Sequence, residues 1–192
     1  MRKTNLLLLA TILLIYSVSA FGQDDKNRGV RAGWQNSNYY EDGNNSGDNL
    51  SAFYIGVTGE KSILPLLKFG SGFEYFQNGI SGSIGNDEYK FKAHTISIPI
   101  YLKLKLGPVF ALGGAGANFT ITQQYKLNDN SVDVPDAAKT NWFDVPVFAG
   151  IGVKILIVTI EARYHWGMLD ASSSDLTNPQ VQYFQIGAGI SF

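Results

Sequence analysis

From Thr95 to Thr122 the sequence reads TISIPIYLKLKLGPVFALGGAGANFTIT. Its first arm has an aliphatic residue at every second position from Ile96 to Leu106, with Ser, Pro, Tyr and Lys between them. This period of two is typical of a β-strand with one apolar and one polar face. Only Gly107-Pro108 joins it to the return arm, so the stretch predicts a hairpin. Strands of about 9–11 residues are long enough to cross a bilayer.

The same alternation recurs along the chain and predicts eight strands. Their approximate bounds are Gly29–Ser37, Ala52–Lys61, Leu66–Gln77, Tyr89–Leu106, Val109–Gln123, Trp142–Ile155, Val158–Leu169 and Val181–Phe192. Long polar connections alternate with short ones; the long ones are Asn38–Asn49, Asn78–Asp87, Gln124–Asn141 and Asp170–Gln180. Outer-membrane barrels have short periplasmic turns, longer outer loops and an even strand number. The order therefore predicts an all-β, eight-stranded antiparallel up-and-down transmembrane β-barrel.

The first 20 residues have the pattern of a secretory signal peptide. Arg2 and Lys3 precede an apolar core from Leu6 to Ile15, and Val18-Ser19-Ala20 fits a small-residue cleavage site. We expect residues 1–20 to be removed on export, leaving residues 21–192 as the barrel domain. No later segment has the pattern of a membrane-spanning helix, and only helices and closed barrels satisfy their backbone in lipid.

The composition excludes several classes of protein. The chain has no cysteine, so it contains neither disulfides nor a thiolate metal site. Its formal net charge is −1, which gives no indication of a nucleic-acid partner. Charged residues are 16% of the chain, fewer than the roughly 25% of soluble domains.

A soluble lipocalin-like barrel would also have eight strands, with its apolar face inward. The polar face here is mostly Gly, Ser, Thr and Tyr with scattered charges, as expected of a narrow filled interior. Aromatic residues also gather near the predicted outer strand ends, as in the headgroup zone of membrane proteins. They are Tyr39, Tyr40, Phe76, Tyr89, Tyr125, Trp142, Phe143, Trp166 and Tyr183. Both features favour the membrane barrel.

Two details of the strands stay open in the sequence. Phe110 and Leu112 share a face with Asn118, so the lipid-facing side of that strand is ambiguous near the turn. Pro99 and Pro146 fall on inward positions of strands, where a missing N–H predicts small bulges or kinks.

Strand parity places eight charged side chains on the inward face near the periplasmic end. They are Arg31, Glu60, Lys68, Lys103, Lys105, Lys154, Glu161 and Arg163. One interpretation is an ion-pair plug in which Glu161 pairs with neighbouring Lys or Arg side chains. The other is an anion site or selectivity-setting constriction, because the basic residues outnumber the acidic ones.

Catalysis has little support in the sequence. His94 and His165 are the only histidines, and no spacing joins them to further metal ligands or to a positioned nucleophile. We interpret both as hydrogen-bonded lumen residues and predict no enzyme activity, cofactor or metal. The acidic segment Asn38–Asn49 lacks the EF-hand spacing and is interpreted as a solvated loop.

Three segments carry a family resemblance: HTISIPIYLKLKLGPVFALGGAGANF (94–119), IEARYHWGMLD (160–170) and YFQIGAGISF (183–192). Together they resemble the PorT-like outer-membrane β-barrel domain of Bacteroidetes. The resemblance implies an outer-membrane location and insertion by the barrel-assembly machinery, which reads a C-terminal aromatic, here Phe192. The namesake of the family acts in type IX secretion, and the family has no catalytic residues.

The sequence thus favours a non-enzymatic outer-membrane barrel with a side-chain-filled lumen. We expect its loops to act in envelope structure, adhesion or secretion-related interactions. Its expected partners are outer-membrane lipid, the barrel-assembly machinery and envelope or secretion-system proteins. The alternative is a small porin-like or anion- or ligand-binding barrel that uses a basic lumen.

Overall fold

The computed structural model describes residues 26–41, 44–45, 48–84, 87–127, 130–132, 141–169 and 180–192. The predicted signal peptide, residues 1–20, lies outside the described residues. Among the described residues there is no helix with the length and apolarity to cross a membrane.

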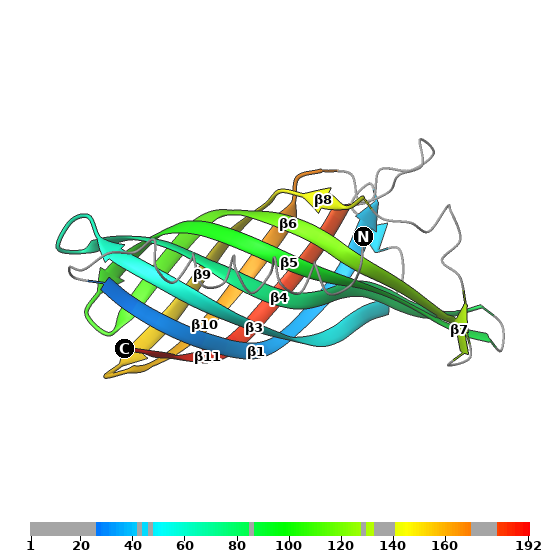
Figure 1. Cartoon of the computed structure of the whole chain (residues 1–192), viewed down its shortest axis with the longest axis horizontal. Helices are drawn as coiled ribbons and strands as arrows, with labels where there is room; N and C mark the ends of the chain where they lie inside the picture. Colours follow the sequence, from blue (N-terminus) through cyan, green and yellow to red (C-terminus); the bar gives the residue numbers. More distant parts are fainter. Residues whose placement is uncertain are drawn as a thin grey trace, which may run out of the picture.

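Eight long strands form one closed antiparallel barrel (Figure 1). They are β1 (Lys26–Glu41), β3 (Asp48–Ser62), β4 (Leu67–Ile84), β5 (Asp87–Leu106), β6 (Val109–Leu127), β9 (Pro146–Ile155), β10 (Val158–Gly167) and β11 (Gln180–Ser191). Each long strand pairs with the next one along the chain, and β11 closes the barrel on β1, from Gly29↔Ser191 to Tyr40↔Gln180. The predicted eight-stranded up-and-down barrel is confirmed.

Three short strands lie at the loop end of the barrel. They are β2 (Asn44–Asn45), β7 (Asn130–Val132) and β8 (Phe143–Asp144). β2 pairs with β1, whereas β7 and β8 pair with β6.

The two faces of the strands meet different surroundings. On β10, Ile160 is 52% exposed between Thr159 at 9% and Glu161 at 6%. The outward face of the barrel carries the same kind of apolar side chain all round, including Val30, Phe53, Phe69, Ile100, Leu102, Ile151, Ile160 and Ile186. Exposed apolar surface of this extent marks a membrane contact. The outward side is therefore apolar and the lumen polar, as the sequence predicts.

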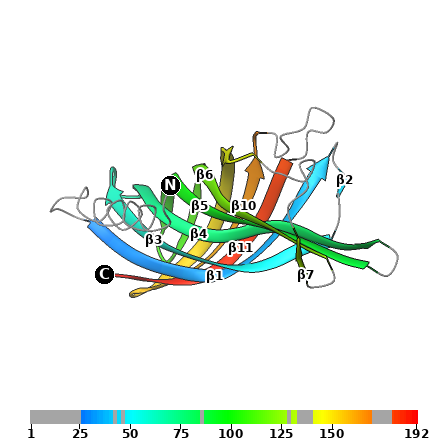
Figure 2. The ribbon, with the colours of Figure 1, turned by 45° about the vertical axis from the view of Figure 1, so that its right-hand side comes forward.

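The predicted polar loops are shorter than expected, because strands extend into three of them. β4 runs to Ile84 and β5 begins at Asp87, so the predicted loop Asn78–Asp87 is almost entirely a hairpin. β1 and β3 likewise enter the loop predicted at Asn38–Asn49, and β6 enters the loop predicted after Gln123. Paired β4, β5 and β6 project from the barrel end (Figure 2). We call residues 77–84, 87–94 and 121–127 the extension.

A bulge in β6 resolves the ambiguous face of that strand. His94 pairs with Thr122 and Thr95 with Thr120, so Ile121 is an extra residue. Before it, even-numbered side chains such as Phe110 and Leu112 are buried in the lumen. Beyond it, Tyr125 packs against the lumen cluster although its number is odd. One inserted residue therefore exchanges the two faces of the strand.

Pro99 and Pro146 are both fully buried. Of the two predicted alternatives, the bulge is wrong at both residues, and the kink stays a prediction. Register continues through Pro99, and its missing N–H leaves only an unpaired stretch opposite β4. Pro146 follows a one-residue break between β8 and β9, which pair with β6 in a single register. The missing hydrogen bonds thus interrupt the ladder without adding a residue.

Candidate functional site in the lumen

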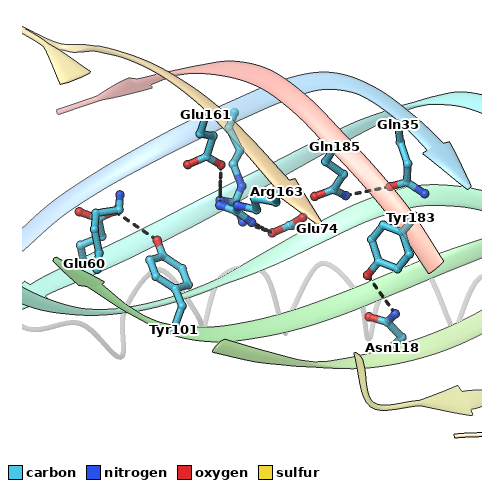
Figure 3. Close-up of polar contacts among 11 residues, drawn as sticks. Gln35, Glu60, Glu74, Tyr101, Asn118, Glu161, Arg163, Tyr183 and Gln185 are labelled. Carbon is cyan, nitrogen blue, oxygen red and sulfur yellow. Dashed lines mark hydrogen bonds and ion pairs between the residues drawn. The ribbon is translucent and has the colours of Figure 1, made fainter. Parts of the chain in front are cut away.

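Four charged side chains from three strands meet in the middle of the lumen. Arg31 on β1, Glu74 on β4, and Glu161 and Arg163 on β10 all occupy inward positions. Their side chains are at most 6% exposed. We call these four residues the central network (Figure 3, in which Glu74, Glu161 and Arg163 are labelled).

Each arginine of the central network contacts both carboxylates. Arg31 Nη1 donates to Glu161 Oε1 at 2.8 Å, and its Nη2 pairs with Glu74 Oε1. Arg163 Nη1 donates to Glu74 Oε1 at 3.1 Å, and its Nη2 lies 2.5 Å from Glu161 Oε1. Two positive and two negative charges balance, so the buried group is neutral. Buried charges are tolerated when they are paired in this way.

A second charged group surrounds Glu60, nearer to the short turns. Its carboxylate pairs with Lys103 and lies 3.7 Å from Lys68 Nζ, and Tyr101 Oη donates to it at 3.2 Å. Lys103 also lies 4.4 Å above the centre of the Phe110 ring, a cation–π contact. Figure 3 shows Glu60 and Tyr101 to one side of the central network.

The structure thus brings six of the eight sequence-predicted charged residues into ion pairs. Lys105 and Lys154 are half-buried and make no ion pair within the described part of the chain. The basic excess inferred from the sequence is therefore concentrated around Glu60, because the central network is neutral.

Towards the loop end, neutral polar side chains continue across the lumen (Figure 3). Gln185 Nε2 donates to Gln35 Oε1 at 2.8 Å, and Gln35 Nε2 donates to Asn78 Oδ1 at 2.6 Å. Asn118 Nδ2 donates to the Tyr183 hydroxyl at 3.3 Å. These amides come from four strands, β1, β4, β6 and β11, so they link opposite walls of the barrel.

Two aromatic clusters fill the remaining space. One contains Tyr54, Phe76, Phe91, Ala93, Val181 and Tyr183, and the other contains Tyr101, Phe110, Leu112 and Phe148. His165 joins them, because its ring stacks on Phe148 at 4.7 Å and on Tyr183 at 4.2 Å between centroids. Side chains thus fill the lumen, as expected of an eight-stranded barrel.

Two aromatic residues lie in the lumen where the sequence predicts a membrane-interface position. Phe76 and Tyr183 are only 1% and 2% exposed, so the interface prediction is wrong for both. The side chains of Tyr39 and Tyr40 lie outside the described residues. Glu74 is absent from the charged residues predicted for the lumen. The alternation of β4 is the only signal in the sequence that could have placed it there, because a partner on the opposite wall leaves no local sequence pattern.

The two histidines occupy different sides of the barrel. His165 is buried in the lumen, where neither ring nitrogen has a hydrogen-bond partner within 3.5 Å among the described residues. His94 faces outward, where its Nδ1 and the Tyr75 hydroxyl are 2.6 Å apart. The prediction of a lumen position is therefore wrong for His94. Within the described residues, no group of three or more His, Asp or Glu side chains could hold a metal.

A small cavity lies at the short-turn end of the lumen. It has a volume of about 30 Å³, enough for one or two water molecules. Arg31, Glu60, Tyr101, Lys103 and Glu161 line it. It therefore lies between the central network and the group around Glu60.

Comparison with known proteins identifies the fold but no family. No protein-family model matches the chain, and no curated protein sequence matches it. The chain is similar to the structure of Ail, the attachment invasion locus protein of Yersinia pestis, in complex with the heparin analogue sucrose octasulfate. That alignment covers 88% of this chain and 100% of Ail, with 17% identity and a TM-score of 0.52. Neisserial surface protein A aligns over 90% of this chain and 100% of its own, with 12% identity and a TM-score of 0.51.

At these identities the likeness concerns the fold alone. The barrel is closed, has an even number of antiparallel strands and presents an apolar outer surface. These are the properties of bacterial outer-membrane barrels. The protein is an eight-stranded β-barrel of the outer membrane.

Proposed function

We propose that this is a non-enzymatic barrel that acts through its surfaces, in envelope structure, adhesion or secretion-related interactions, and not through an open channel. The observation that carries the proposal is the filled lumen. The central network crosses it between β1, β4 and β10, and an aromatic cluster lies on either side. A solute would have to break buried ion pairs and displace packed rings to pass.

The extension supports a role at the loop end. Strand pairing continues there from Gln77↔His94 to Ile84↔Asp87. Lys90 is directly opposite Lys126 on its face, and neither lysine makes an ion pair within the described residues. Such a paired sheet presents a fixed surface to a partner. Ail, which shares the fold, is named for attachment, and adhesion is accordingly the first interaction to test.

Two further expectations remain part of the proposal. The PorT-like relationship is supported only by the three sequence segments quoted above. Recognition of Phe192 by the barrel-assembly machinery is supported by its position directly after β11, where it is 74% exposed. The porin-like alternative would need the lumen to open.

Planar-bilayer conductance of the refolded protein, residues 21–192, tests the filled lumen. We expect no steady conductance. Steady conductance that shifts on Lys103→Gln or Lys105→Gln, but not on Lys90→Gln in the extension, would replace the proposal with the porin-like alternative.

Single cysteines test which end acts outside the cell, because the natural chain contains none. A membrane-impermeant maleimide should label Lys90→Cys on intact cells. It should label Ser62→Cys, at the short-turn end, only after the outer membrane is permeabilised. The reverse pattern would contradict a loop end that faces outward.

A further inference from the structure

The short turns at one end of the barrel are apolar. Ile63, Leu64 and Leu66 between β3 and β4 are 54–58% exposed, and Ile157 between β9 and β10 is 57% exposed. On β5, the apolar outward face runs from Ile96 to Leu106, about 25 Å of height at the usual strand rise and tilt. This already equals the usual apolar band of about 25 Å. The apolar turns therefore extend beyond the hydrocarbon band.

The backbone conformation of Leu156 indicates that an apolar residue is needed in these turns. It is the non-glycine residue with positive φ among the described residues, at +56°, and its side chain is 89% exposed. The left-handed region costs an ordinary L-residue roughly 1–2 kcal/mol, and Gly or Asn would fit better. In water, an exposed leucine side chain would not offset this cost. Contact of the side chain with lipid would offset it, because the side chain is apolar.

A basic mouth opens at the same end. Lys68 and Lys103 are directly opposite each other on β4 and β5, and they are 8% and 7% exposed. Lys105 lies two residues beyond Lys103 on the same face of β5, and the Lys154 backbone N–H donates to the Pro108 carbonyl, in the turn after β5, at 2.7 Å. Four lysines thus lie at this end of the lumen with one carboxylate, Glu60, an excess of three positive charges. Like charges opposite one another destabilise a sheet. Glu60 offsets this for Lys68 and Lys103, whereas Lys105 and Lys154 make no ion pair in the described structure.

The small cavity lies deeper in the lumen, where Arg31 and Glu161 line it together with Glu60, Tyr101 and Lys103. It has room for one or two water molecules only, so the lysines of the mouth itself have to supply the donors for a larger anion. Ammonium groups and hydroxyls are the donors that an oxyanion accepts hydrogen bonds from, and charge-assisted hydrogen bonds are the strong ones.

We propose that the short-turn mouth of the barrel is a phosphoryl-binding site. The apolar turns lie in the inner leaflet, and Lys68, Lys103, Lys105 and Lys154 surround a phosphate oxygen. The phosphoryl group belongs either to a phospholipid headgroup or to a free phosphate ion. Because the turns place the mouth at headgroup level, the lipid explains both observations together.

This site is separate from the proposed function. A filled barrel can bind phosphate at its mouth without conducting ions. If the barrel did conduct, the binding experiment would still test the phosphoryl site on its own. Lys105 and Lys154 are the residues to change, because neither takes part in an ion pair of the described structure.

The experiment uses the full barrel, refolded in an uncharged maltoside detergent. Inorganic phosphate is titrated and followed by phosphorus NMR, and phosphatidylglycerol is titrated and followed by native mass spectrometry. The double variant Lys105→Gln/Lys154→Gln should lower the affinity for the phosphoryl compound about tenfold, because two charge-assisted donors are lost. Lys90→Gln/Lys126→Gln removes the same charge from the extension and should change binding less than twofold.

Leu156→Asn separates the two sources of phosphate, because asparagine accepts the positive φ and the fold is kept. It should weaken phosphatidylglycerol binding and leave inorganic phosphate binding unchanged if the lipid is the ligand. Equal binding of both compounds by the natural chain and by Leu156→Asn would identify the free ion. The proposal is overturned if neither compound binds, or if both lysine pairs have the same effect.

Discussion

Arg163 Nη1 lies 3.1 Å from Glu74 Oε1, although their strands, β10 and β4, are not neighbours in the sheet. The ion pair therefore spans the lumen. Together with Arg31, which contacts Glu74 and Glu161, it ties the two halves of the barrel wall to each other.

Glu161→Gln should strongly destabilise the barrel, because Arg31 and Arg163 would then share one carboxylate. Breaking a buried ion pair from one side typically costs about 3–5 kcal/mol. Urea unfolding in vesicles, followed by tryptophan fluorescence, measures the change, and heat-modifiable gel migration should report it too. The double variant Glu161→Gln/Arg163→Gln keeps the network neutral and should lose less. An unchanged unfolding midpoint for the single variant would rule out a stabilising network.

Gly70→Ala should also destabilise the barrel. A methyl group at this buried position would overlap the Tyr101 ring, and forcing extra volume into a packed interior costs about 1–3 kcal/mol. Gly113→Ala is the matched control, because its methyl group would meet only the Phe148 carbonyl oxygen, at 3.6 Å. The same unfolding experiment should show little change for it. Equal losses in both variants would mean that the effect comes from the strand backbone.

The cost of a charge on the outer face should depend on depth. Ile100 and Leu106 lie on the same face of β5 and are 50% and 57% exposed. Ile100→Lys, in the middle of the apolar band, should cost about 2–4 kcal/mol, whereas Leu106→Lys at the turn should cost about 0–1 kcal/mol. Unfolding in vesicles of one lipid composition makes the comparison. Equal costs at the two positions would contradict the placement of the band.

His165→Phe should leave the stability unchanged or raise it slightly. The imidazole is stacked between Phe148 and Tyr183, and its nitrogens lack hydrogen-bond partners in the described structure. Replacing an unsatisfied buried polar group by an apolar ring of similar shape is often neutral. The unfolding midpoint and heat-modifiable migration test this. A loss above about 2 kcal/mol, typical of an orphaned buried partner, would indicate a polar role for the ring.

The sequence predicted the fold well because alternation is a local property. In β5 it identified both the lipid-facing residues from Ile96 to Leu106 and the inward lysines Lys103 and Lys105. Loop lengths then ordered the strands. The extension was missed because Asn, Gly and Ser disfavour strands locally. Pairing with β5 and packing of Ile80 against Phe91 and its cluster overcame that preference.

The site was only partly predictable. Strand alternation identified inward residues such as Arg31 and Glu161 but could not say which residues pair with which. The pairing depends on the stagger of the strands around the closed barrel. This stagger cannot be inferred from the sequence of any single strand. For the same reason the aromatic rings of Phe76 and Tyr183, which look like interface residues in the sequence, fill the lumen.

The central network also sets an order for assembly. Arg31 and Glu74 belong to the first part of the chain to be exported, whereas Glu161 and Arg163 arrive with the penultimate strand. Within each of these parts the charges already balance, since Arg31 pairs with Glu74 and Arg163 pairs with Glu161. The contacts that join the two parts, Arg31 with Glu161 and Arg163 with Glu74, form only when β10 reaches its place and β11 pairs with β1. Closure of the barrel therefore adds two buried ion pairs at the last stage of assembly.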